Sequence, residues 1–154
     1  MRLFTVLGIV LLVTNSYAQN KEINTMTNPT ELTKEFIKDY KEWNDFAYGL
    51  NGSNDTKSDN EIGKMYDDLI LKFCSPEKKY QGLAYGSDSD HCPEQERVIS
   101  EKIESTKAIV KTKFINKKFS FINHDYEYHF TLSENKWILE ELYLVDDEGK
   151  YKSL

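Results

Sequence analysis

The chain has 154 residues, a formal net charge of −6, two cysteines and three histidines. This length fits one domain with a substantial core, and a second domain is not expected. The acidic balance argues against a nucleic-acid partner, because phosphate binding needs a basic surface; a basic protein partner, or a surface that serves only solubility, is compatible with it.

Residues 1–18 have the parts of a secretory signal peptide. Arg2 supplies the positive start, residues 3–13 are apolar, and Ser16-Tyr17-Ala18 places small residues where signal peptidase cuts. The apolar run is too short for a membrane span, which needs about 20 residues. We therefore expect cleavage after Ala18 and export, to the periplasm of a Gram-negative host or otherwise to the medium. An uncleaved membrane anchor is the alternative.

Residues 19–28 are polar and unperiodic, which indicates a flexible lead-in to a single domain over residues 29–154. Asn28-Pro29-Thr30-Glu31 then has the form of a capping box with proline at the first helical position. The helix that begins there should end near Tyr48. Its apolar positions recur at helical spacing: Leu32, Phe36, Tyr40, Trp43, Ala47 and Leu50.

A second helix is expected from Ser58, which forms another capping box with Glu61, to about Cys74. Pro76 ends it, and residues 77–93 follow as an irregular loop. A loop this long in a small domain is often functional.

Cys74 and Cys92 are a candidate disulfide, since a nearby pair tends to close in an oxidising compartment. The alternative is that Cys74, next to an apolar helix face, is a buried thiol. His91, His124 and His129 do not combine with the cysteines at metal-ligand spacing, so no metal site is expected.

The rest of the chain alternates as strands do, over about 97–104, 108–114, 126–132 and 137–145, with a short final pairing at Tyr151. In the last long strand Glu140 shares a face with Ile138, Leu142 and Leu144, so a carboxylate interrupts an apolar row unless a β-bulge redirects it. Two helices followed by antiparallel strands indicate an α+β fold, with the helices on one face of a curved sheet. This order resembles the cone-shaped nuclear transport factor 2-like, or cystatin-like, fold.

Four segments carry a more specific resemblance: EFIKDYKEWNDFAYGL, LILKFCSPEKKY, AYGSDSDHCPEQERVISEKIESTKAIVKTKF and DYEYHFTLSENKWILEELYLVD. Together they are similar to bacterial immunity proteins of this fold, which are encoded beside polymorphic toxins that they bind and neutralise. The resemblance spans residues 29–146. Its most specific elements are Glu42-Trp43, Lys72-Phe73-Cys74, Tyr85-Gly86, Tyr126, Tyr128 and Trp137. It implies a cognate toxin as partner and no cofactor. The signal peptide is a departure, since many members look cytosolic.

No catalytic set is apparent, because the chain lacks a nucleophile elbow, a glycine-rich phosphate loop and a spaced Cys/His or Ser/His/Asp arrangement. Trp43 and Trp137 are expected in the core, with a place in the lining of a ligand pocket as the alternative. Tyr126 and Tyr128 either pack against the helices or line a pocket. The alternative to a toxin inhibitor is a small-molecule binder or proton-transfer enzyme. Its candidate groups are Glu140 or Glu141 as base beside Tyr126, Tyr128 and His129. An envelope protein without a toxin partner is a third possibility.

The loop is the sequence-based prediction for the toxin contact. Its acidic residues Asp88, Asp90 and Glu94 would meet a basic groove on the toxin, with Tyr80 and Tyr85 as anchors. The alternative is that the loop packs over the sheet edge, while the concave sheet face or a helix binds.

Overall fold

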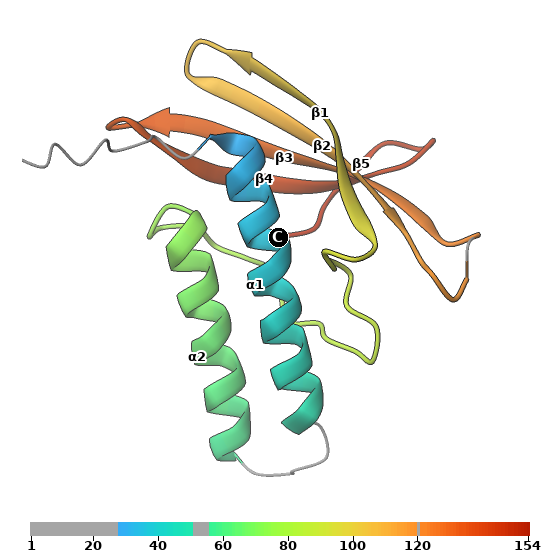
Figure 1. Ribbon diagram of the computed structural model, residues 1–154. Coiled ribbons are helices and arrows are strands. Elements are labelled where there is room, and N and C mark those ends of the chain that lie inside the picture. Colours follow the sequence, from blue (N-terminus) through green and yellow to red (C-terminus); the bar gives the residue numbers. More distant parts are fainter. Residues whose placement is uncertain (1–27, 51–55, 120) are drawn as a thin grey trace, which may run out of the picture.

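The computed structural model describes residues 28–50, 56–119 and 121–154. Helices α1 (Pro29–Leu50) and α2 (Thr56–Phe73) precede strands β1 (Glu96–Glu104), β2 (Lys107–Ile115), β3 (Asn123–Ser133), β4 (Lys136–Val145) and β5 (Lys150–Lys152). The strands form one antiparallel sheet in the order β1-β2-β3-β4-β5. Both helices lie on one side of this twisted, open sheet (Figure 1), which confirms the expected α+β fold. The predicted signal peptide, and the predicted lead-in up to residue 27, lie outside the described residues.

The start of α1 uses half of the expected capping box. The Asn28 side-chain oxygen accepts a hydrogen bond from the Glu31 amide at 2.8 Å, which satisfies one of the free N–H groups at the helix start. The Glu31 carboxylate does not reach back to Asn28; it pairs with Lys34 at 2.7 Å instead. The helix therefore begins where the sequence predicts, by a single cap.

The core lies between the helices and the row of β2 and β3 side chains that faces them. In the β2–β3 register Val110 lies opposite Tyr128 and Ala108 opposite Phe130, and all four are buried. Phe36 of α1 packs edge-on against Tyr128, with ring centroids 5.8 Å apart. The alternation read from the sequence is therefore correct for these strands, and it leaves their other face without a helix in the described part of the chain.

A β-bulge at Glu140 changes which β4 residues enter the core. His129 pairs with Glu141, whereas the next residue, Phe130, pairs with Leu139, so Glu140 has no partner across the ladder. The core face of β4 therefore comprises Trp137 and Leu139 before the bulge and Leu142 and Leu144 after it. The sequence-based placement of Ile138 on that face was wrong, because it assumed unbroken alternation. For Glu140 the sequence analysis allowed that a β-bulge redirects the side chain, and the structure has that bulge.

Candidate partner-binding site

A polar cluster is buried between α1 and the sheet. The carboxylate of Glu96 lies at its centre, with 0% of the side chain exposed. Its Oε1 accepts hydrogen bonds from the hydroxyls of Thr112 and Tyr128, the latter at 2.8 Å, and its Oε2 lies 2.8 Å from Nδ1 of His91. Among the described residues no buried side-chain nitrogen or oxygen lacks a hydrogen-bond partner. The cluster is therefore a closed and satisfied part of the core.

Aromatic rings enclose this cluster. The His91 ring packs at 4.8 Å from Tyr40 and at 4.6 Å from Tyr126, centroid to centroid. Burial raises the pKa of Tyr128 well above its ordinary value, and the nearby Glu96 carboxylate adds to the effect. Burial likewise raises the pKa of Tyr126, with a contribution from Asp90. Both tyrosines therefore stay protonated and act as hydrogen-bond donors inside the fold.

Sequence reasoning placed Tyr126 and Tyr128 in a helix-facing row but missed their partners. Glu96 carries a weak signal, because it lies two residues before Val98 at the start of a strand and so shares its face. Thr112 stands in the middle of the apolar row of β2. His91 lies in a loop, and only the tertiary fold brings it to the other two.

The residues of the proton-transfer alternative do not come together. Glu140 pairs with Lys107 at 2.9 Å, and His129 lies 2.9 Å from Glu127. Glu141 pairs with Lys152 at 2.8 Å and with Lys78 at 3.0 Å. All three candidates lie on the helix-free face of the sheet or at its β4 edge. The sheet therefore separates them from Tyr126 and Tyr128.

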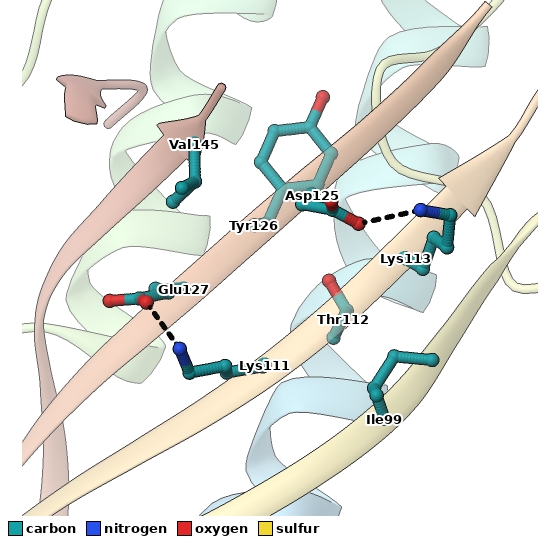
Figure 2. Close-up of a pocket in the computed structure, with 8 residues that line it drawn as sticks. All are labelled: Ile99, Lys111, Thr112, Lys113, Asp125, Tyr126, Glu127 and Val145. Carbon is teal, nitrogen blue, oxygen red and sulfur yellow. Dashed lines mark hydrogen bonds and ion pairs between the residues drawn. The ribbon is translucent and has the colours of Figure 1, made fainter. Parts of the chain in front are cut away.

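A shallow depression of about 370 Å³ lies on the helix-free face, over β2 and β3. Figure 2 shows two ion pairs along it, Lys111 with Glu127 at 2.9 Å and Lys113 with Asp125 at 3.2 Å, each joining neighbouring strands. Ile99 of β1 and Val145 of β4 supply apolar surface at its sides. The depression is thus a charged surface with small apolar margins.

Glu127 is buried in this face although no helix covers it. Burial alone would raise its pKa, but hydrogen bonds from Lys150, Lys111 and His129 outweigh burial and lower the pKa from the ordinary 4.5 to about 2. The carboxylate is therefore charged over the whole physiological range. Glu141 follows the same pattern, because Lys152 and Lys78 lower its pKa against the effect of burial.

The Glu127→Gln variant should lose about 1 to 2 kcal/mol of unfolding free energy at pH 7, a range that allows for solvent screening of the partly exposed lysines. Because the folded-state pKa lies below the unfolded one, this stabilisation is present above pH 4.5 and is lost as pH falls towards 2. Urea unfolding at several pH values should show the gap between wild type and variant closing over that window. A difference in unfolding free energy that stays constant with pH would contradict this prediction. Glu104→Gln is the control, because Glu104 forms an exposed ion pair with Lys102.

The two loop tyrosines are held against the helices. The Tyr80 hydroxyl donates a hydrogen bond to Asp67, and its ring packs edge-on against Tyr66 at 4.8 Å. The Tyr85 ring packs edge-on against Trp43 at 6.0 Å. Beside it, the Asn44 amide accepts a hydrogen bond from the Gly86 N–H at 3.1 Å and donates one to the Gly86 carbonyl at 2.9 Å. This half of the loop is therefore fixed to α1 and α2.

The acidic loop residues have different surroundings. Asp88 pairs with Lys118 of the β2–β3 connection at 2.9 Å. Asp90 is exposed, and its backbone carbonyl accepts a hydrogen bond from Tyr126 at 3.4 Å. Glu94 is exposed and accepts a hydrogen bond from the Cys92 thiol at 2.7 Å. The structure places all three along one stretch of loop, with Asp88 already paired.

Cys74 and Cys92 are separate buried thiols in the structure. Burial raises the pKa of Cys74 to about 12, so its reactive thiolate form is scarce at neutral pH. The structure thus has the buried-thiol alternative and not the disulfide.

Trp43 and Trp137 both lie in the core, with Trp43 completely enclosed. The indole N–H of Trp43 donates a hydrogen bond to the Ile62 carbonyl of α2 at 3.2 Å. In the described part of the chain, no group of three or more His, Cys, Asp or Glu is placed to hold a metal ion. No helix among the described residues is long and apolar enough to cross a membrane.

The model of one protein family, described as NTF2 fold immunity protein, matches residues 28–153. No curated protein and no solved structure matches the chain significantly. The family match covers both helices, the loop and all five strands.

Proposed function

Because the chain belongs to the NTF2 fold immunity protein family, we propose that it is an exported protein that binds one cognate bacterial toxin and neutralises it without chemistry of its own. Immunity proteins act in general by toxin neutralisation, and the match over residues 28–153 is the observation that carries this proposal. Export rests on the signal-peptide pattern of residues 1–18. The partner is a protein, probed most directly through the product of the neighbouring gene.

The closed polar cluster supports a non-catalytic role. Glu96, His91 and Tyr128 are groups of the kind that perform acid–base catalysis, and they lie within hydrogen-bond distance of one another. A substrate atom would have to reach them, yet the side chains of Glu96 and His91 are 0% and 1% exposed. A second function as a proton-transfer enzyme would therefore need α1 to move away from the sheet.

The proposal predicts protection against a toxin delivered to the compartment of the exported protein. Cells that express the full chain should survive the toxin encoded by the neighbouring gene, and the two proteins should purify as a complex. Mass spectrometry of the complexed chain should find an N-terminus near Gln19. A matched variant lacking residues 2–18 stays in the cytosol and should give no protection against toxin in the exported compartment.

Each part of the proposal has its own contrary result. The absence of both protection and a complex would overturn neutralisation and would favour an envelope protein without a toxin partner. An intact Met1 on the mature protein would overturn export alone.

The loop remains the sequence-based prediction for the contact. Because Tyr80 and Tyr85 pack on the helices, they could act as anchors only through the edges that remain exposed. Asp90 and Glu94 are exposed, so a basic groove on the toxin could reach them, as the prediction requires. The charges on the opposite side of the molecule provide a competing surface.

A further inference from the structure

The helix-free face carries continuous rows of side chains across the strands. Register places Lys111, Glu127, Tyr143 and Lys152 side by side on β2, β3, β4 and β5. The adjacent row comprises Lys113, Asp125, Val145 and Lys150. Residues that alternate in this way project from the same side of a sheet. We call Lys111, Lys150 and Lys152, with the acids that they pair with and Tyr143 between them, the lysine patch.

The acids of the lysine patch are buried and its lysines are exposed. The Glu127 side chain is 6% exposed, and that of Glu141 is 9% exposed. Their lysine partners cover them: the side chain of Lys111 is 57% exposed and that of Lys152 is 63% exposed. At these two pairs a partner therefore meets the ammonium groups and not the carboxylates beneath them.

The patch is also locally positive. Glu127 is paired with both Lys111 and Lys150, and Glu141 with both Lys152 and Lys78. Within the patch three lysines thus face two carboxylates, and Lys78, 13% exposed beside Glu141, adds a further positive charge on a chain whose net charge is −6. Such a local positive field attracts an acidic surface of another protein and accelerates its approach.

The lysine side chains are held in place before any partner arrives. A free lysine loses considerable rotamer entropy when a partner immobilises it. Here ion pairs of 2.9 Å and 2.8 Å hold Lys111 and Lys152, and each ammonium keeps further N–H donors for a partner. Tyr143 lies between them with its ring 4.9 Å from that of His129, and tyrosine is a preferred anchor at protein interfaces.

Charge decides between the candidate occupants. A two-fold dimer through this face would set lysines against lysines, and packing it onto another part of a second copy would give an open, non-closing assembly. Nucleic acid is disfavoured, because the patch contains no arginine and the chain as a whole is acidic. A different protein with an acidic surface fits both observations.

We propose that the lysine patch is the surface on which the cognate toxin docks, through an acidic segment of the toxin. This inference rests on the proposed function and assigns its contact to the helix-free face of the sheet. The depression between Ile99 and Val145 extends the same surface towards β1.

The test is the association rate of the mature protein with the purified toxin encoded by the neighbouring gene, measured at several salt concentrations. The variant is Lys111→Gln with Lys152→Gln, which leaves Lys150 on Glu127 and Lys78 on Glu141, so neither buried acid loses all its lysine partners. Association at low salt should slow roughly tenfold and depend less on salt.

A matched control makes the same charge change on the helices. Lys38→Gln with Lys64→Gln removes two lysines from exposed pairs with Glu42 and Asp68 and should change the rate less than about twofold. Melting temperatures of both variants check that they are folded. Equal rates for wild type and the patch variant would overturn the docking surface, while the complex itself would still support neutralisation; absence of any complex would overturn both.

Three further results would assign the contact elsewhere. Slower association in Asp88→Asn with Asp90→Asn, together with an unchanged patch variant, would place the contact on the loop. A dimer of the wild type that the patch variant converts to monomer would identify a second copy as the occupant. Binding of a 20-base-pair duplex that the patch variant abolishes would identify nucleic acid. Each of these results contradicts toxin docking at the patch.

Discussion

Replacing Trp43 with alanine should destabilise the protein by about 3 to 5 kcal/mol, because the truncation leaves a cavity where the largest fully buried side chain of the core was. The Trp43 ring packs at 4.5 Å from Tyr66 and at 5.2 Å from Tyr40, centroid to centroid. The change also removes the hydrogen bond to the Ile62 carbonyl, which joins α1 to α2. Chemical unfolding monitored by circular dichroism measures the loss.

Phe46→Ala is the control for this variant, because Phe46 lies three residues further along the same helix and is 38% exposed. It should change the unfolding free energy by about 0.5 kcal/mol or less, as surface substitutions usually do. If Trp43→Ala unfolds like the parent yet fails to bind the toxin, Trp43 is a contact residue and its assignment to the core is wrong.

Glu96→Ala should also cost about 3 to 5 kcal/mol, through a different mechanism. The variant leaves the hydroxyls of Thr112 and Tyr128 and the His91 ring without their shared acceptor in a site that water does not reach. Thermal or urea unfolding should therefore show a loss much larger than the one expected for Glu101→Ala, where the carboxylate is exposed.

Glu96→Gln separates a structural role from a catalytic one. Its amide oxygen still accepts hydrogen bonds from Thr112 and Tyr128, so the loss of unfolding free energy should be clearly smaller than for alanine. Toxin binding should be unchanged, because the cluster is sealed from the surface. Loss of a biological activity in a glutamine variant that unfolds like wild type would contradict this account and favour acid–base chemistry at Glu96.

The elements with strong local signals were predictable. The cap at Asn28 and the spacing of apolar residues gave the start of α1, and alternation gave all four long strands to within a few residues. These signals are local, because residues two positions apart share a strand face and residues three or four positions apart share a helix face. The family match confirms the fold and the resemblance to immunity proteins.

The polar cluster and the lysine patch could not be derived in the same way. Glu96 and His91 meet Tyr128 across more than thirty residues of sequence, and no local pattern specifies that contact. The net charge of −6 does not reveal the positive patch. That patch arises because the fold buries Glu127 and Glu141 beneath the lysines with which they pair. Register between strands, not composition, creates that surface.

The bulge at Glu140 bears on how relatives of this chain should be aligned. Inserting or deleting one residue within a strand normally turns every following side chain to the wrong face, so alignment gaps inside strands are usually treated as errors. In β4 the core positions change from odd to even numbers at the bulge, with Leu139 before it and Leu142 after it. A homologue one residue shorter here would keep its core by regular alternation, so a single-residue gap at Glu140 is structurally sound.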